Sequence, residues 1–490
     1  MGVLRVLLLT SACATVQAPE AGDALEDGIA RVETGLLTHN VVRGEDARLT
    51  IEERLRFYRV PAVSVAVIDG GRIDWARAWG TVEVGRGSAA DTTTLFQAAS
   101  ISKPVTAAGA LQLVEDGVVT LDGDVNQWLD SWQVPESPFT VEEPVTLRRL
   151  LSHTAATTVS GFPGYTAADP IPMLVQVLEG SGPANTEPVE VDTFPGSQFR
   201  YSGGGYSIVQ LLIEDVTGKP FSDFMSERIL GPAGMTHSTF AQPLPLDRAD
   251  EAATAHGLDG APIPGRYHIY PEMAAAGLWT TPSDLARFVL EIQRALTGIE
   301  GGPISPENAH LMLSRREGDP YGLGVWVDGA ADSLWFYHGG SNEGFQTWMM
   351  GSGTEGRGLA VMTNGAGGYG LAMEIVRSIG REYGWDLFLP TAHDAIQVPI
   401  DRLAGLTGTY RSEPDGEGES FVIEIRLEGG ELRASLPAFG WSGYRLRAQS
   451  PTRFFFLEGP GTLEFNDNQT GADVEVVLTG LGEPLRAVRR

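Results

Sequence analysis

The wide separation of the strand candidates is the feature that most constrains how this chain can fold. A β-branched run near the start and its hairpin partner flank the turn Asp69-Gly70-Gly71, and further strand signals return only some 240 residues after that hairpin. The predicted strands are residues 62–68, 73–79, 321–327, 345–350 and 359–363, and residues 370–383 predict a closing helix. The residues between the two groups are mostly helical, with long loops. The strands must share a sheet to bury their apolar faces, which predicts one α+β domain.

The pattern changes after about residue 395. Residues 421–427 alternate between apolar and polar side chains, Glu428-Gly429-Gly430 forms a turn, and residues 431–436 continue the pattern. Further strand candidates are residues 453–457, 462–465 and 474–478, with no helical stretch among them. Short strands at this spacing predict a small antiparallel β domain, similar to a barrel, over residues 395–490.

The N-terminal residues resemble a secretory signal. Arg5 is followed by a short apolar run and then by small residues, which predicts a signal peptide over residues 1–18. Residues 19–28 are small and acidic and predict a linker, so the main domain is expected over residues 29–390. We therefore expect a periplasmic or secreted protein. A lipoprotein tethered at Cys13 is the alternative, although Thr10 stands where a lipobox has leucine.

Charge and composition exclude several classes of partner. Among 490 residues, 35 are basic and 63 acidic, for a net charge of −28, which argues against nucleic acid and anionic membranes. No segment after the N-terminal run reaches the roughly 20 apolar residues of a membrane span. The single cysteine and the spacing of the eight histidines predict no metal site, and no cofactor motif is present. The oligomeric state stays open.

Ser100 and Lys103 begin a predicted helix, and they stand three residues apart. This spacing rises about 4.5 Å and places both side chains on one helix face. A serine needs an adjacent base to become a nucleophile, and a buried lysine can lose its charge and serve as that base. Lys103 is one of only two lysines in a chain where 33 of the 35 basic residues are arginine. The alternative interpretation of this pair is that Ser100 only caps the helix and Lys103 is a charge on the surface.

Two further motifs accompany this pair. Residues 199–206, Phe-Arg-Tyr-Ser-Gly-Gly-Gly-Tyr, precede a helical stretch, and residues 336–341, Phe-Tyr-His-Gly-Gly-Ser, lie between two strand candidates. With these motifs the chain resembles the serine β-lactamase and penicillin-binding superfamily. The resemblance is to the class C-like branch, with its D-alanyl-D-alanine carboxypeptidases, D-aminopeptidases and family VIII carboxylesterases. It covers about residues 29–385 and implies a β-lactamase/transpeptidase-like fold.

The resemblance implies a role for each matching residue. Ser100 would be the acyl-accepting nucleophile, Lys103 its proton partner and Tyr201 the residue that moves a proton between nucleophile and leaving group. Gly339, Gly340 and Ser341 would form the strand that lies along the substrate. The backbone N–H groups of Ser100 and Ser341 would form the oxyanion hole.

Two departures from the family pattern bear on the substrate. Gly203 stands where many β-lactamases have a substrate-binding asparagine, and His338 stands where they have a lysine. The resemblance implies that both positions lie in the substrate-binding pocket. A neutral imidazole at position 338 would hold a substrate carboxylate less well than a lysine. Residues 161–165 and the loop to Pro195 are expected to line the pocket.

These observations predict an exported serine hydrolase that cleaves a small ester or amide, including D-amino-acid peptides, through an acyl-enzyme on Ser100. The alternatives are a penicillin-binding or sensor protein that acylates without efficient deacylation, and a weak β-lactamase. A further hypothesis, from outside the enzymes, is a catalytically inactive scaffold whose β domain binds a partner.

Overall fold

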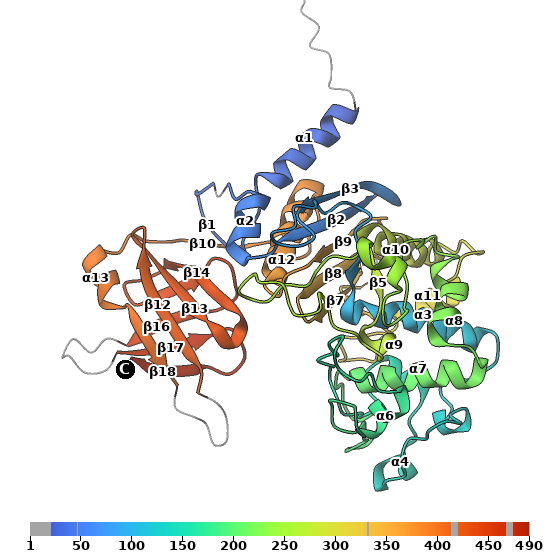
Figure 1. Ribbon diagram of the computed structural model, residues 1–490. Coiled ribbons are helices and arrows are strands. Elements are labelled where there is room, and N and C mark those ends of the chain that lie inside the picture. Colours follow the sequence, from blue (N-terminus) through green and yellow to red (C-terminus); the bar gives the residue numbers. More distant parts are fainter. Residues whose placement is uncertain (1–20, 47, 331–332, 413–419, 467–473, 490) are drawn as a thin grey trace, which may run out of the picture.

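The structure is a computed structural model that describes residues 21–46, 48–330, 333–412, 420–466 and 474–489. It consists of an α+β body and a β-barrel that stands beside it (Figure 1). The predicted signal peptide and Cys13 lie outside the described residues. Within the described residues, no helix is long and apolar enough to cross a membrane.

A six-stranded antiparallel sheet forms the centre of the body, in the order β3-β2-β9-β8-β7-β6. Its strands are β2 (Ala62–Asp69), β3 (Arg72–Gly80), β6 (Trp326–Asp328), β7 (Trp335–Asn342), β8 (Phe345–Ser352) and β9 (Gly358–Thr363). The early hairpin and the late strands thus share one sheet, which confirms the predicted α+β class. Pairing of β2 with β9 joins the two groups, with Val65 opposite Val361.

The predicted strand over residues 321–327 is wrong for most of its length. Only Trp326–Asp328 forms a strand, and Tyr321 pairs with Trp326 as an isolated bridge. The chain turns sharply at Gly324, where φ is +98° and a Cβ atom would lie 2.7 Å from the Cβ atom of Ala107. This close approach to a helix leaves no room for an extended strand with side chains.

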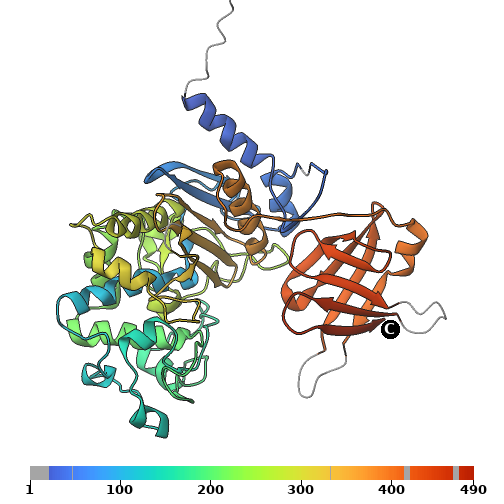
Figure 2. The same ribbon diagram turned by 180° about the vertical axis from the view of Figure 1, so that it is seen from behind.

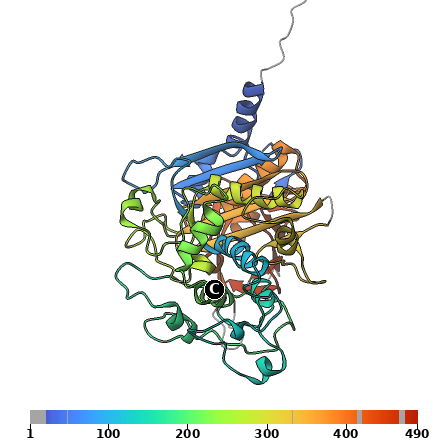
Figure 3. The ribbon, with the colours of Figure 1, turned by 90° about the vertical axis from the view of Figure 1, so that its right-hand side faces the viewer.

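Helices cover both faces of the sheet, as the side view shows (Figure 3). Helix α10 (Pro282–Leu296) packs on one face, and α12 (Gly368–Tyr383), the predicted closing helix, packs on the other. Helix α1 (Ala21–Glu33) packs against α12. The linker expected over residues 19–28 is therefore helical from Ala21 onward, because Leu25, Ile29 and Val32 provide an apolar stripe that packs on the body.

The remaining elements of the body lie mainly on the α10 side of the sheet and include two short strands that pair with each other, β4 (Phe96–Gln97) and β5 (Trp279–Thr280). The helices are α2 (Ile51–Tyr58), α3 (Ser102–Glu115), α4 (Pro138–Glu142), α5 (Leu147–Leu151), α6 (Leu174–Glu179), α7 (Gly203–Thr217), α8 (Phe221–Met225), α9 (Met273–Ala276) and α11 (Pro306–Leu313). Short helical turns are η1 (Ala99–Ile101), η2 (Val125–Gln127), η3 (Ser226–Leu230) and η4 (Leu246–Glu251). Helices α3, α7 and α9 pack against one another and carry the site described below.

The C-terminal residues form a closed eight-stranded antiparallel barrel in which each strand pairs with the next and β11 pairs with β18. Its strands are β11 (Gly408–Arg411), β12 (Val422–Glu428), β13 (Glu431–Leu436), β14 (Trp441–Ala448), β15 (Arg453–Phe456), β16 (Thr462–Asn466), β17 (Glu475–Thr479) and β18 (Leu485–Arg489). The predicted barrel is confirmed. Strands β11, β14 and β18 were not predicted, nor were the short helix α13 (Ile400–Gly405) and the turn η6 (Pro437–Phe439).

A long connection after α12 joins the body to the barrel, as the rear view shows (Figure 2). Part of it, β10 (Thr391–His393), pairs in parallel with β1 (Asn40–Val42). The side chain of Asn40 donates to the carbonyls of Phe456 and Gly459 in the barrel, at 2.7 and 3.1 Å. The N-terminal and C-terminal parts of the chain therefore meet at this junction.

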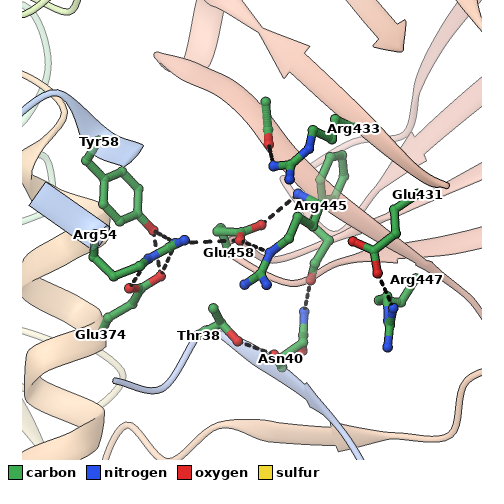
Figure 4. Close-up of polar contacts among 12 residues, drawn as sticks. Thr38, Asn40, Arg54, Tyr58, Glu374, Glu431, Arg433, Arg445, Arg447 and Glu458 are labelled. Atoms are coloured by element: carbon green, nitrogen blue, oxygen red, sulfur yellow. Dashed lines mark hydrogen bonds and ion pairs between the residues drawn. The ribbon is translucent and has the colours of Figure 1, made fainter. Parts of the chain in front are cut away.

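A buried cluster of charges also crosses the junction (Figure 4). Arg54 of α2 binds Glu374 of α12 through two hydrogen bonds of 2.6 and 2.7 Å. Arg54 also lies 3.5 Å from Glu458 of the barrel. Glu458 in turn accepts from the backbone and side chain of Arg445, both at 2.7 Å. The side chains of Arg54, Glu374 and Glu458 are nearly inaccessible to solvent.

Candidate active site

Ser100 lies in the 3₁₀ turn η1, which leads directly into α3. The preceding residue, Ala99, has a φ of +51°, a left-handed conformation that is uncommon for a residue with a Cβ atom. A hydrogen bond to another segment fixes the turn: Ser102 Oγ accepts from the N–H of Leu278 at 3.0 Å. Ser100 is therefore presented at the start of a helix on a tightly constrained turn, as its position before Pro104 predicts.

Lys103 lies in the first turn of α3, and its side chain is buried. Its Nζ atom lies 3.1 Å from Ser100 Oγ and 2.9 Å from the carbonyl oxygen of Ala275. The residue is only 2% exposed, and burial lowers the pKa of Lys103 to about 7. A neutral amine here can donate to Ala275 and direct its lone pair at the serine hydroxyl. The geometry suits proton transfer from Ser100 to Lys103.

Tyr201 lies just before α7, whose start is capped by Ser202 Oγ accepting from the N–H of Gly205 at 3.0 Å. The Tyr201 ring lies 5.0 Å from Lys103 Nζ, and it packs on the ring of His153 with centroids 4.2 Å apart. Burial raises the pKa of the Tyr201 hydroxyl, and interaction with the Ser100 side chain opposes that rise. Tyr201 is therefore a protonated phenol at neutral pH and is equipped to donate a proton.

His153 supports Tyr201 from behind. Its Nδ1 atom accepts from the N–H of Ser202 at 3.1 Å, so the proton of the neutral ring is on Nε2. Burial and the nearby charge of Lys103 lower the pKa of His153 well below its ordinary value. The ring is thus a neutral packing surface that orients Tyr201.

His338 projects from β7 into the same site and is 2% exposed. Its Nδ1 atom donates to the carbonyl of Gly339 at 2.6 Å, so Nε2 must accept from the Tyr321 hydroxyl, 3.0 Å away. Burial, followed by the charge of Lys103, lowers the pKa of His338 to about 3. The imidazole is neutral, as expected, and both of its nitrogen atoms are already hydrogen-bonded within the protein.

Strand β7 passes very close to the turn that carries Ser100. A Cβ atom on Gly340 would lie 2.2 Å from the carbonyl oxygen of Ala98 and 2.4 Å from Thr347 Oγ1, so only glycine fits. Ser341 follows on the exposed side of the strand, where its hydroxyl accepts from Gln346 at 2.8 Å. Strand β7 is therefore placed to lie along a substrate bound at Ser100.

A cavity of about 620 Å³ opens over Ser100. It brings together Ser100, Tyr201, His338, Gly339, Gly340 and Ser341, all of which the sequence predicted. The lining residues that the sequence did not predict are Trp326, Tyr337, Gln346, Trp348, Tyr369 and Phe388. Tyr337 belongs to the motif of residues 336–341, and Trp348 lies opposite Gly339 of that motif in the sheet, but no sequence pattern points to Tyr369 or Phe388.

Two expectations about the pocket are wrong. Gly203 does not line the cavity, because its N–H donates to the carbonyl of Ser160 at 3.1 Å and the ring of Phe162 covers its Cα atom. Residues 161–195 also do not line the cavity, whose walls come from Trp326, β7, β8, α12 and the connection after it. Phe162 packs over the start of α7 instead.

The other lysine, Lys219, is exposed and forms an ion pair with Glu227. Across the part of the chain that the structure describes, no group of three or more histidine, cysteine or acidic side chains could hold a metal ion. The site thus pairs a serine hydroxyl with a buried amine.

The sequence of this chain matches a known protein family. Residues 47–379 match the Beta-lactamase family model. Protein Rv1367c of Mycobacterium tuberculosis is 30% identical over 250 residues, which are 46% of this chain and 60% of that protein. Protein flp of Staphylococcus aureus is 25% identical over 325 residues, which are 64% of this chain and 61% of that protein. The matches thus span about 60% of the length of these relatives.

Solved structures share the fold at low sequence identity. The octameric penicillin-binding protein homologue from Pyrococcus abyssi aligns over 96% of this chain and 100% of its own, with a TM-score of 0.58 and 19% identity. The β-lactamase/D-alanine carboxypeptidase from Yersinia pestis aligns over 67% of this chain and 96% of its own, with a TM-score of 0.53 and 19% identity. The first of these alignments includes the region of the barrel.

Proposed function

The chain belongs to the Beta-lactamase family, and we propose that it is a serine hydrolase that cleaves small esters or amides through an acyl-enzyme on Ser100. The observation that carries the proposal is the 3.1 Å contact between Ser100 Oγ and Lys103 Nζ, made by a buried lysine whose pKa is lowered to about 7. A lysine in this state is a base at neutral pH. A surface lysine or a capping serine would have neither property.

The proposed reaction begins with neutral Lys103 accepting the Ser100 hydroxyl proton as Oγ attacks the substrate carbonyl. The tetrahedral intermediate then collapses, the bond to the leaving group breaks, and the leaving group takes a proton from the phenol of Tyr201, which is reprotonated by Lys103. In deacylation a water molecule attacks the acyl carbonyl and gives its proton to neutral Lys103. The acyl–Oγ bond then breaks, and Lys103 returns that proton to Ser100 Oγ. The N–H groups of Ser100 and Ser341 are proposed to hold the oxyanion, as the family resemblance implies.

Replacement of the nucleophile tests this assignment. We expect Ser100→Ala to abolish hydrolysis of p-nitrophenyl acetate, whereas Ser222→Ala, at a half-buried serine of α8, should retain wild-type turnover. In intact-mass spectra, a fluorophosphonate probe should add once to the wild type and not to Ser100→Ala. Retained turnover in Ser100→Ala would contradict the proposal, and failure of the wild type to react would favour an inactive scaffold.

A second candidate is a penicillin-binding or sensor protein that is acylated but turns over slowly. It is favoured by the absence of any carboxylate among the residues that line the described cavity, since a deacylating water would depend on Tyr201 and Lys103 alone. Intact-mass spectra after incubation with benzylpenicillin, alongside a nitrocefin assay, separate the cases. A stable adduct without product indicates the sensor, and nitrocefin turnover indicates a weak β-lactamase.

Export is proposed on the pattern of residues 1–18 alone, either as a periplasmic or secreted protein or as a lipoprotein tethered at Cys13. Mass spectrometry of the mature N-terminus after expression in a bacterial host tests it. Cleavage near residue 18 would support a secreted form, and a lipidated Cys13 would support the tether. An intact N-terminus in the cytoplasm would contradict export.

A further inference from the structure

The far end of the active-site cavity is built from aromatic rings. Tyr337 of β7 stacks on Trp348 of β8, with ring centroids 5.4 Å apart and planes inclined by 20°. Phe388 meets both rings edge-on, at 5.4 and 5.5 Å. Tyr369, at the start of α12, lies 6.2 Å from Trp348. We call these four residues the aromatic shelf; all four line the cavity that also contains Ser100.

The shelf is open toward the cavity. Tyr369 is 52% exposed and Phe388 is half-buried, so part of each ring is accessible to a bound ligand. Gly339 lies between the shelf and the catalytic residues and has no side chain to divide them. The cavity, at about 620 Å³, falls within the range of small-ligand pockets and offers more room than a scissile ester alone requires.

The backbone at Phe388 supports a specific role for its ring. The residue has a φ of +58°, in the left-handed region that a bulky side chain rarely adopts. It belongs to the connection that leaves α12 for the barrel, where other backbone conformations are open to the chain. Such local strain persists where the surrounding structure holds it, often at ligand sites. Here it places the ring over the edge of Tyr337 and Trp348.

No Asp, Glu, Lys or Arg is among the described residues that line this cavity. The nearest charge at the catalytic end is that of Lys103, 3.1 Å behind Ser100 Oγ. His338 is neutral, and both of its ring nitrogen atoms are occupied by Gly339 and Tyr321.

Two arginines act on the shelf hydroxyls from outside the lining, Arg377 on Tyr369 and Arg315 on Tyr337. Arg377 donates to His39 Nδ1 at 3.0 Å, and Arg315 donates to the carbonyls of Val327 and Gly329 at 3.0 and 3.4 Å. A substrate carboxylate would lose part of its hydration here, and none of the described lining residues would replace it with an opposite charge.

We propose that the aromatic shelf is a specificity subsite that binds an uncharged apolar group of the substrate, with an aryl ring as its best ligand, and that it disfavours substrates with a carboxylate at this position. This inference rests on the proposed hydrolase function and narrows its substrate class to neutral esters or amides with an aryl or similar apolar group. Rings in edge-to-face and stacked contact with the shelf supply the binding energy.

Pairs of esters test the subsite. Their hydrolysis is followed in a pH-stat, which measures the acid released, and kcat/KM is determined for each ester. Methyl 4-phenylbutyrate is compared with methyl butyrate, and 4-phenylbutyl acetate with butyl acetate, so that the ring is on the acyl side in one pair and on the alcohol side in the other. We expect at least a tenfold preference for the phenyl ester in one pair. Monomethyl glutarate, which carries a carboxylate, should be at least tenfold poorer than methyl butyrate.

Variants then assign the preference to the shelf. Tyr369→Ala and Phe388→Ala should each reduce the phenyl preference about fivefold or more, and Tyr369→Phe should retain it because the ring is what binds. Phe439 is an aromatic residue of the barrel that is 40% exposed and lies outside the shelf. The substitution Phe439→Ala is therefore the matched control and should leave the phenyl preference unchanged. Equal kcat/KM values within both ester pairs, or a preference that survives both alanine substitutions, would overturn the proposal.

Binding separates failure of the subsite from failure of the proposed reaction. If the wild type hydrolyses none of the esters, the hydrolase proposal fails, and calorimetric titration with 4-phenylbutanol still tests the shelf. Binding that is weakened at least fivefold by Phe388→Ala and Tyr369→Ala, and not by Phe439→Ala, would support it. Equal affinity in all four proteins, or no binding, would overturn it.

Discussion

The proposed chemistry of the site depends on one amine, Lys103. It stands three positions after Ser100 in the sequence, but its environment depends on α9, which supplies the Ala275 carbonyl that accepts from Nζ at 2.9 Å. Burial lowers the pKa of Lys103 to about 7, so the fraction of neutral amine rises steeply between pH 6 and 8. An exposed lysine would remain protonated throughout this range.

The pH dependence of acylation follows from this. We expect kcat/KM for p-nitrophenyl acetate to rise with pH through a midpoint near 7 and then level off, because only the neutral amine accepts the serine proton. Lys103→Arg should lose at least a thousandfold, since arginine stays charged. A profile that is flat from pH 5.5 to 8.5, or substantial activity in Lys103→Arg, would show that the residue is only a positive charge.

Glu272 is a second buried ionisable residue, outside the catalytic pair. Both of its carboxyl oxygen atoms are buried without a hydrogen-bond partner among the described residues, and burial raises its pKa to about 8. A raised pKa means that the folded state favours the protonated form. This contribution to stability is complete below the ordinary pKa of a glutamate and is lost as the pH rises to about 8.

Glu272→Gln should therefore remove part of the pH dependence of stability. We expect the wild type to lose melting temperature between pH 5 and pH 8, and we expect Glu272→Gln to lose less, because the amide is neutral at both values. Glu187→Gln, at an exposed position, is the control and should follow the wild type. Parallel curves for Glu272→Gln and the wild type would contradict a protonated Glu272 in the fold.

At the scale of elements, the approach of β7 to the Ser100 turn is the decisive contact. Gly340→Ala would place a methyl group 2.2 Å from the carbonyl oxygen of Ala98, which belongs to backbone and cannot rotate away. The strand or the turn must shift, and both carry groups of the proposed active site. We expect kcat/KM to fall at least a hundredfold, because small displacements of reacting groups cost about that much.

The control for this substitution is Gly161→Ala, where a Cβ atom meets nothing within 4 Å. It should leave both activity and melting temperature near wild type. Circular dichroism spectra of Gly340→Ala distinguish a displaced site from a protein that does not fold. Wild-type kcat/KM in a folded Gly340→Ala would show that β7 need not lie so close to Ser100.

Elements could be predicted from the sequence where their pattern was local. The alternation of residues 421–427 and the β-branched run at 62–68 predicted strands that the structure contains. The linker expected over residues 19–28 is helical from Ala21. Its apolar residues are buried only because α12 packs beside them, and that contact is not visible in the sequence. At Gly324 a close approach to α3, invisible in the sequence, ended the expected strand.

At the scale of the whole molecule, Glu458 links the barrel to the body. It lies between Arg445 of the barrel and Arg54 of α2, and its side chain is fully buried. Removing one member of a buried ion cluster leaves the others without compensation. Glu458→Gln should therefore lower the free energy of unfolding by about 3 kcal/mol, measured by urea denaturation of the full chain.

An exposed pair in the barrel is the matched control. Arg453 and Glu464 lie 3.9 Å apart, with about half of each side chain accessible to solvent. Because solvent screens such pairs, Glu464→Gln should change the free energy of unfolding by less than about 0.5 kcal/mol. Equal effects of the two substitutions would mean that the cluster at the junction does not fasten the barrel.

The sequence by itself determined the two kinds of architecture and which residues are proposed to react. Ser100 and Lys103 have a spacing that local helix geometry turns into one face, Tyr201 stands in a motif of its own, and the barrel follows from alternation along single strands. Only the tertiary structure decided what surrounds them. The pKa of Lys103 depends on burial by α9, and the aromatic shelf combines β7, β8, α12 and the connection after it. These properties arise from segments brought together by packing, and no local pattern along the chain encodes such contacts.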